Sequence, residues 1–236
     1  MGKSVRVGLL GASGFVGGAI FNRFSKSLEH VCIPIIRGDN LEIMLKEVDF
    51  VIHCANSAKR FVANSKPDED RRASLDKTIR ILEAADGKPI LLVSSISCRT
   101  QSDTPYGMNR LDCEREVLRY GGSIVRLGPM FGETRTADVI HDICESRKVF
   151  LARSTRYSFS NVNWNGTYIA DNFEEISGTI EIGARNTTTL EELALYANSK
   201  SEFIGGNDDQ FPLGFNDGPD VVEVYEFIDH LLSTRN

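Results

Sequence analysis

The stretch Val5-Arg6-Val7-Gly8-Leu9-Leu10-Gly11-Ala12-Ser13-Gly14-Phe15-Val16-Gly17-Gly18 decides the fold of this chain. Its apolar beginning is typical of a buried parallel strand. Glycines spaced G-x-x-G-x-x-G follow, and residues 19–24 continue as a helix. Glycine permits a tight turn and leaves room for a pyrophosphate, whose charge is attracted by the N–H groups and dipole of a helix N-terminus. This order predicts a dinucleotide-binding turn; glycines that only pack the helix against the strand are the alternative.

The composition is that of an ordinary soluble domain. With 236 residues, 41% hydrophobic and 25% charged, the chain is long enough to bury a substantial core. A net charge of −6 argues against a general nucleic-acid binder. No apolar run reaches the roughly 18 residues of a membrane span, and the first strand begins too close to Met1 for a signal peptide.

The cysteines and histidines are scattered along the chain. The five cysteines form no C-x-x-C pair, which is typical of thiols in a reducing cytoplasm. The four histidines have no metal-ligand spacing, so no protein-bound metal is expected. His53 lies inside an apolar run, which favours a buried, hydrogen-bonded core residue over a ligand.

Apolar runs alternate with helical patterns along most of the chain. Strands are expected at 31–36, 49–54, 89–95 and 122–127, and helices at 41–46, 68–85 and 104–120. This alternation predicts an α/β fold of the Rossmann type, a doubly wound parallel sheet with helices on both faces. Beyond Gly128 the pattern loosens, with helices expected at about 136–147 and 220–232, a strand at 179–182 and a helix capped by Thr188 or Thr189. We therefore expect a dinucleotide-binding core over 1–132 and a small mixed α/β substrate lobe over 133–236 that completes the sheet, together forming a single compact unit.

Residues capable of acid–base chemistry follow the fourth predicted strand. Ser94 and Ser95 end that strand, Tyr106 opens the next helix, and Arg110 lies four residues on, on the same helix face. A hydroxyl that orients a carbonyl, a phenol that moves a proton and a cation that favours the phenolate suit alcohol–ketone interconversion beside a dinucleotide. The alternative is a capping serine, a buried tyrosine and a surface arginine.

Five ordered motifs over about residues 4–175 resemble the short-chain dehydrogenase/reductase superfamily, in particular its extended branch of NAD(P)-dependent nucleotide-sugar epimerases, dehydratases and reductases. The motifs are Gly11-Ala12-Ser13-Gly14-Phe15-Val16-Gly17, Asp49-Phe50-Val51-Ile52-His53-Cys54-Ala55, Val93-Ser94-Ser95-Ile96-Ser97, Tyr106-Gly107-Met108-Asn109-Arg110 and Val125-Arg126-Leu127-Gly128-Pro129-Met130-Phe131-Gly132. The resemblance implies that Ser95 is the catalytic hydroxyl and Tyr106 the acid/base, and Arg110 is expected to act with them. It implies cofactor contacts along the turn, at Gly11, Ser13, Gly14, Phe15, Val16 and Gly17, and at Ala55 and Pro129. Further cofactor contacts are expected at Arg37, Asp39, Cys54, Asn56, Ser94, Tyr106, Arg110 and Met130.

Three features depart from that family. The family's Y-x-x-x-K is here Tyr106-x-x-x-Arg110, and arginine keeps the charge and can hold a ribose hydroxyl but does not release a proton. Only residues 96–105 separate Ser95 from Tyr106, which is short for the extended branch. The region between the second and third strands also lacks room for the usual additional β–α unit.

The residue at the end of the second strand bears on the choice of cofactor. Arg37 follows Gly17 by twenty residues, where an acidic side chain would bind the ribose of NAD and arginine can accept the 2′-phosphate of NADP. Asp39 is close enough to bind the ribose or adenine. NADP is therefore favoured over NAD, with a solvated arginine as the alternative.

The expected substrate contacts are Ser57, Ser97, Phe131, Arg135 and Asn161, and Lys59 follows the third strand nearby. Arginines together with amides and aromatic rings are typical of a nucleotide-sugar site, and they are equally typical of a solvent-exposed surface. The sequence thus predicts a cytoplasmic NAD(P)-dependent oxidoreductase or epimerase of a nucleotide-linked sugar, with a homodimer compatible with the resemblance. A non-catalytic dinucleotide-binding regulator and a reductase of a small carbonyl compound are the alternatives, which the fold alone does not separate.

Overall fold

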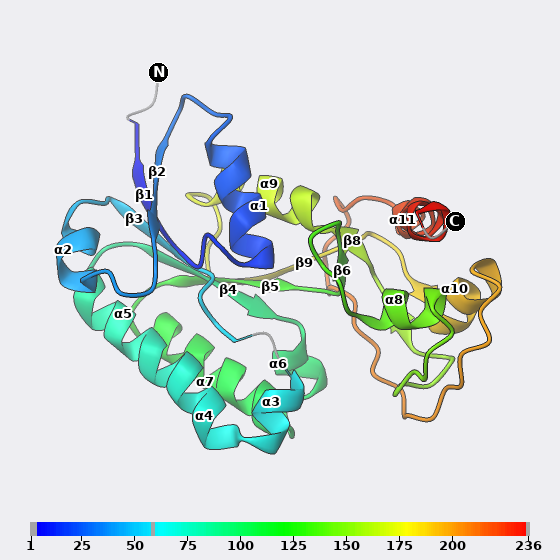
Figure 1. The fold of residues 1–236 in the computed structure, drawn as a ribbon. Coiled ribbons are helices and arrows are strands. Elements are labelled where there is room, and N and C mark those ends of the chain that lie inside the picture. Colours follow the sequence, from blue (N-terminus) through cyan, green and yellow to red (C-terminus); the bar gives the residue numbers. More distant parts are fainter. Residues whose placement is uncertain (1–3, 58–59, 235–236) are drawn as a thin grey trace. The chain divides into compact units, whose positions relative to one another are not determined.

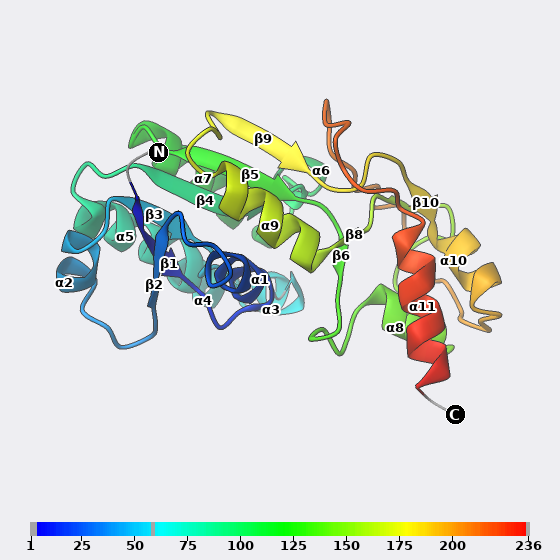
Figure 2. The ribbon, with the colours of Figure 1, turned by 90° about the horizontal axis from the view of Figure 1, so that it is seen from above.

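A twisted sheet forms the centre of the computed structural model, which describes residues 4–57 and 60–234. In that part of the chain the sheet has six strands in the order β2-β1-β3-β4-β5-β9 (Figures 1 and 2). Their bounds are β1 Arg6–Leu10, β2 Val31–Ile35, β3 Phe50–His53, β4 Ile90–Ser95, β5 Ser123–Leu127 and β9 Thr179–Ile182. The strands predicted from the apolar runs are all present.

The strand order reverses beside β1. Val7 pairs in parallel with Cys32 of β2 on one side and with Phe50 of β3 on the other. The chain therefore winds outward in both directions from β1, and the carboxyl ends of β1 and β3 flank the switch point at which open α/β sheets bind ligands. This arrangement confirms the predicted doubly wound sheet.

Helices cover both faces of the sheet, with α1 and α9 on one face and α5 and α7 on the other (Figure 1). The helices of this region are α1 Phe15–Phe24, α2 Leu41–Lys46, α3 Arg60–Ser65, α4 Pro67–Arg71, α5 Lys77–Ala85, α6 Ser97–Thr100, α7 Pro105–Arg119 and α9 Val162–Asn172. Apolar side chains of α5 and α7, among them Ile81 and Val117, pack against strand residues such as Val51 and Leu92 in one buried cluster. Burial of this cluster fixes the helices on the sheet, at roughly 25 cal/mol per Å² of apolar surface.

The helix predicted over 68–85 is divided into three parts. A π-helical turn, η1 Arg72–Asp76, lies between α4 and α5. Inserted π turns are rare and often accompany functional sites, because they rotate the side chains that follow. Lys77, at the start of α5, is half-buried, and its Nζ donates to the Ala55 carbonyl at 2.7 Å.

The remaining elements are short. They are β6 Met130–Phe131, β7 Arg156–Tyr157, β8 Ser160–Asn161, β10 Thr188–Thr189, α8 Val139–Cys144, α10 Leu190–Tyr196 and α11 Glu223–Ser233. Thr189 caps α10 in a complete capping box with Glu192, so the predicted cap is confirmed. Helices α8, α10 and α11 share a buried cluster that includes Ile140, Leu193 and Ile228.

By internal contacts the chain divides into two compact units. Unit 1 contains residues 1–126 and 165–180, and unit 2 contains residues 127–164 and 181–236. The chain returns to unit 1 after residue 164. The division into a dinucleotide-binding core over 1–132 and a substrate lobe over 133–236, together forming a single compact unit, stays a prediction. Between residues 4 and 57 and between 60 and 234, no helix is both long and apolar enough to span a bilayer.

Candidate active site

The glycine turn lies between β1 and α1 in unit 1. Gly11 has a φ of +91°, which favours glycine, and a Cβ there would lie 2.8 Å from the Cys54 carbonyl carbon. A Cβ on Gly17 would collide with the Gly11 carbonyl. The Gly14 N–H donates to the Gly11 carbonyl at 2.9 Å, and helix α1 begins at the next residue. The turn therefore brings a helix N-terminus close against the end of β3, and it contains all six predicted residues from Gly11 to Gly17.

The end of β3 is held by two polar side chains. His53 is fully buried; its Nδ1 accepts from the Ala55 N–H at 3.2 Å, and its Nε2 is 3.1 Å from Thr78 Oγ1. Burial, together with the positive charges of Lys77 and Arg110, lowers the pKa of His53 to about 3. This neutral, fully bonded imidazole confirms the core interpretation.

Asn56 follows this turn with an unusual amide. Its Nδ2 and Oδ1 are buried, and neither has a hydrogen-bond partner within the described part of the chain. Unsatisfied buried polar groups are costly, so such an amide is suited to a ligand that bonds it. Ser57, a predicted substrate contact, is half-buried beside it; Lys59 lies outside the described residues.

Tyr106 lies between two arginines. Its side chain is buried at the start of α7, where Thr104 caps the helix through the Gly107 N–H at 3.1 Å. The guanidinium carbon of Arg110 is 5.2 Å from the centre of the Tyr106 ring, and that of Arg60 is 5.9 Å from it. Both distances are within cation–π range. The predicted pairing of a phenol with a cation one helical turn away is therefore present.

Arg110 is buried, and the interpretation as a surface arginine is wrong. Its Nη2 lies 3.4 Å from Asp70 Oδ2 and donates to the Ser74 hydroxyl, and the Arg110 and Asp70 side chains are 3% and 0% exposed. The guanidinium Nε and Nη1 are buried and have no hydrogen-bond partner among the described residues. Asp70 thus compensates the charge of Arg110, while two nitrogens of the guanidinium keep unused hydrogen-bonding capacity among the described residues.

The serines of β4 point in different directions. The Ser95 hydroxyl donates to Ser97 Oγ at 3.1 Å, and Ser97 Oγ accepts from Arg60 Nη2 at 2.8 Å. Hydrogen bonds from Ser95 to Ser97 and from Arg60 to Ser97 therefore connect Ser95 to the guanidinium that lies near the Tyr106 ring. The Ser94 hydroxyl instead donates to Glu114 at 2.6 Å. A cofactor contact by Ser94 stays a prediction.

The residues predicted to choose between NAD and NADP form the turn after β2. Arg37 is exposed, and Gly38 beside it has a φ of +102°. Asp39 Oδ2 accepts a hydrogen bond from the Ile36 N–H at 2.8 Å and so stabilises the turn that contains Asp39. Burial, and after it the charge of Arg37, lowers the pKa of Lys77. Of the two predicted residues, Arg37 therefore has the side chain that is more accessible to a phosphate.

The other predicted contacts belong to unit 2. Met130 and Phe131 form β6, which pairs in parallel with Ser160 and Asn161. The Pro129 carbonyl accepts from the Ser160 N–H at 3.1 Å and so anchors the turn before β6. Arg135 Nη1 donates to the Met130 carbonyl at 3.1 Å. These contacts place Pro129 and Met130 in one bonded turn.

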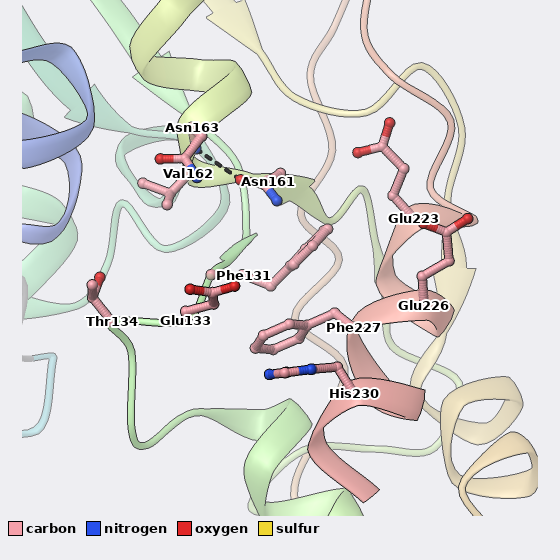
Figure 3. Close-up of a pocket in the computed structure, with 11 residues that line it drawn as sticks. Phe131, Glu133, Thr134, Asn161, Val162, Asn163, Glu223, Glu226, Phe227 and His230 are labelled. Atoms are coloured by element: carbon pink, nitrogen blue, oxygen red, sulfur yellow. Dashed lines mark hydrogen bonds between the residues drawn. The ribbon is translucent and has the colours of Figure 1, made fainter. Parts of the chain in front are cut away.

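A cavity of about 530 Å³ in unit 2 is lined by Phe131, Gly132, Glu133, Thr134, Asn161, Val162, Asn163, Glu223, Glu226, Phe227 and His230 (Figure 3). The Phe131 and Phe227 ring centroids are 5.2 Å apart. Burial, with Glu226 and Asp220 nearby, raises the pKa of Glu223. Two predicted substrate residues, Phe131 and Asn161, therefore share a cavity with apolar rings and carboxylates, whereas Arg135 is not part of its lining.

The sequence reasoning did not identify Arg60, Asp70 and Ser74. The spacing of Asp70, Ser74 and Thr78, each four residues from the next on one helical face, could have indicated a polar stripe in an otherwise amphipathic segment. All three are buried. No comparable pattern in the sequence indicated Arg60. Across the described residues, no group of three or more His, Cys, Asp or Glu side chains is placed to hold a metal ion.

No protein-family model matches this chain, and no curated protein matches it significantly in sequence. Its structure is similar to that of MoeE5 in complex with UDP-glucose and NAD, at 17% identity and a TM-score of 0.77, with 98% of each chain covered. It is also similar to a UDP-glucose 4-epimerase with UDP-glucose from Thermotoga maritima (12%, 0.76, 98% of this chain and 100% of that one). A third similar structure is RMD from Pseudomonas aeruginosa complexed with NADPH (15%, 0.75, 99% and 100%). At these identities the likeness establishes the fold, and the predicted Rossmann-type α/β fold is confirmed.

Proposed function

We propose that this chain is an NAD(P)-dependent oxidoreductase or epimerase that acts on a hydroxyl or carbonyl of a nucleotide-linked sugar. The observation that carries the proposal is the placement of Tyr106 between Arg60 and Arg110, in the same compact unit as the glycine turn. A phenol beside fixed cations is suited to proton transfer, and a glycine turn at a helix N-terminus is suited to a diphosphate.

A nicotinamide dinucleotide fits the groups that this unit presents. Gly11 packs against the Cys54 backbone without a side chain of its own, and at the glycines of this turn a diphosphate can approach the backbone. Hydroxyl and amide groups of the cofactor would satisfy the buried nitrogens of Arg110 and the buried amide of Asn56. Asn56 and Arg110 are therefore the residues we expect to bind the cofactor away from its phosphates.

Bound nicotinamide would supply or accept the hydride. Tyr106 would give the proton to, or take it from, the substrate oxygen, since its hydroxyl is the group with acid–base capacity at the centre of the cluster. The Ser95 hydroxyl would orient that oxygen by a hydrogen bond, and Ser97 and Arg60 hold Ser95 in place. Arg110 would act through its fixed charge, because a guanidinium does not release its proton.

Two further parts of the proposal concern specificity. The exposed Arg37 in the turn after β2 favours NADP over NAD, because a guanidinium suits a 2′-phosphate. The similar structures include complexes with UDP-glucose, which supports a nucleotide sugar as the substrate class. In unit 2, the cavity at Phe131 and Phe227 presents apolar rings and carboxylates, the groups that bind the faces and hydroxyls of a sugar.

One observation favours a second candidate, a dinucleotide-binding regulator without catalysis. Asp70 neutralises Arg110, and this weakens the field that the cation exerts on Tyr106. A protein that binds a dinucleotide but no longer catalyses a reaction would tolerate this ion pair between Asp70 and Arg110. Both candidates require dinucleotide binding, and they differ in turnover.

Purified protein separates these candidates. Titration with NADPH, NADP, NADH and NAD, followed by nicotinamide fluorescence and calorimetry, measures binding. Turnover is then measured over a panel of nucleotide sugars and simple ketones. Binding with turnover of a nucleotide sugar supports the enzyme, binding without turnover of any compound supports the regulator, and no binding of any of the four cofactors by folded protein refutes both.

A further inference from the structure

Asp70 has an environment that a surface ion pair does not have. Its carboxylate is fully buried between α4 and α7, and Oδ2 accepts from Asn109 Nδ2 at 2.9 Å as well as facing Arg110 Nη2 at 3.4 Å. Ser74, one turn on, binds the same Nη2. Two residues of the α4–η1 segment therefore hold a single nitrogen of the guanidinium.

Holding one nitrogen fixes the orientation of the others. The guanidinium is planar and carries its donors in a rigid fork, so contacts at Nη2 determine where the Nε and Nη1 donors point. Those two nitrogens are buried and have no hydrogen-bond partner among the described residues. A lysine ammonium at this position would be a single rotatable point charge and would need no such clamp.

The charges of the pair are matched as well. A buried arginine without a counter-ion is strongly disfavoured, and a buried carboxylate is equally so. Asp70 thus permits a guanidinium to lie under the Tyr106 ring, 5.2 Å from its centre, at no net buried charge.

We propose that Asp70 is a positioning residue, which holds Nη2 of Arg110 so that Nε and Nη1 are presented to hydroxyl groups of a bound dinucleotide. The proposal rests on the proposed function, because it names the cofactor as the ligand of those nitrogens. Asp70 and Arg110 then form one functional pair, in which the carboxylate is required because the cation is an arginine.

The test uses the full-length protein and measures the dissociation constant of NADPH by fluorescence at fixed ionic strength. Asp70→Asn keeps the size of the side chain and removes its charge, and we expect binding to weaken about tenfold, the effect of losing one well-aimed charged hydrogen bond. Asp68→Asn, at an exposed position of the same helix, is the matched control and should bind as the unmodified protein does.

A double-mutant cycle separates positioning from simple support of the fold. Arg110→Met removes the guanidinium. Asp70→Leu alone should weaken NADPH binding, whereas in the Arg110→Met background the same substitution should produce no further loss of NADPH affinity. An apolar pair of similar size often maintains stability, so circular dichroism and thermal melting should report a folded double variant. If Asp70→Asn does not fold, Asp70→Glu keeps the charge and moves the carboxylate; weaker NADPH binding is expected there as well.

The outcomes are distinct. If the unmodified protein binds neither NADPH nor any other nicotinamide dinucleotide, the proposed function fails, and this inference fails with it. If the unmodified protein binds NADPH and the Asp70 variants bind it equally well, only the positioning role is refuted. A loss on replacing Asp70 that is just as large in the Arg110→Met background also refutes it, because Asp70 would then act independently of Arg110.

Discussion

The Ser94 hydroxyl donates a hydrogen bond of 2.6 Å to Oε1 of Glu114, and both residues are buried. The same carboxylate binds Arg126, with Nη2 of Arg126 2.6 Å from Oε2. Strands β4 and β5 are in this way connected to helix α7. Glu114 lies one turn beyond Arg110, which lies one turn beyond Tyr106, so one stripe of α7 carries the phenol, the cation and this anchor.

Breaking the anchor should destabilise the fold. Glu114→Ala removes the carboxylate that pairs with the mostly buried Arg126, and we expect a loss of about 3 kcal/mol in the free energy of unfolding. Ser94→Ala removes a hydrogen bond to a charged group and should cost about 2 kcal/mol. Urea unfolding followed by circular dichroism measures both, with Ser102→Ala as the exposed control. Equal midpoints for Ser94→Ala and Ser102→Ala would contradict the assigned role of the bond.

Tyr106→Phe tests the acid–base assignment. The variant keeps the ring between the two arginines and removes the proton-carrying hydroxyl, so turnover should fall at least about a hundredfold. NADPH affinity should remain nearly unchanged, since the loss is confined to the transition state. Steady-state kinetics and fluorescence titration on the same preparation measure the two quantities. Turnover at the unmodified rate would exclude Tyr106 as the acid or base.

Gly17→Ala tests the packing of the dinucleotide turn. Because its Cβ would collide with the Gly11 carbonyl, the turn must shift; we expect about 2 kcal/mol of lost stability and at least tenfold weaker dinucleotide binding. Gly18→Ala is a matched control on the same helix, since the nearest atom to its Cβ is the Ala12 carbonyl oxygen at 3.4 Å. That variant should be slightly more stable, because alanine favours a helix over glycine. The assignment would be wrong if the two variants behaved alike.

Arg37→Ala tests the preference for NADP. Removing the guanidinium should weaken NADP binding about tenfold and leave NAD binding within twofold, because only NADP carries the 2′-phosphate. Calorimetric titrations with both cofactors give the ratio. Arg72→Ala, at an exposed position of η1, serves as the control for a loss of positive charge. Equal weakening of NAD and NADP by Arg37→Ala would remove the argument from the 2′-phosphate.

His53 should make the protein sensitive to mild acid. Burial first, and then Lys77 and Arg110, lower its pKa to about 3 in the folded state, whereas the unfolded chain binds this proton near pH 6.5. The unfolded state therefore binds more protons between these values, and stability falls as the pH decreases from about 6.5 towards 3, by up to about 1.4 kcal/mol per pH unit.

His53→Asn removes the imidazole that titrates and keeps a hydrogen-bond acceptor for the Ala55 N–H. Urea unfolding between pH 4 and 7 should therefore show a shallower loss of stability for the variant than for the unmodified protein. Identical slopes for His53→Asn and the unmodified protein would show that His53 is not the titrating group.

Local patterns predicted the parts of the fold that depend on neighbouring residues. The turn from Gly11 to Gly17, the capping of α10 by Thr189 and the strand over 179–182 agree with the structure, because glycine geometry, capping and apolar runs act over a few residues. The π turn at η1 was not predicted, since nothing in the local sequence distinguishes it from a continuous helix.

The sequence by itself determined the alternating α/β order, the glycine turn and the chemical types that surround Tyr106. Only the tertiary structure decided their partners. Asp70 lies forty residues before Arg110, and Arg60 lies more than forty residues before Tyr106. Glu223, on the last helix, lines the same cavity as Phe131. Parallel strands require long crossovers, so residues that meet at one edge of the sheet come from distant segments. Their pairing depends on how the helices pack, which no local pattern encodes.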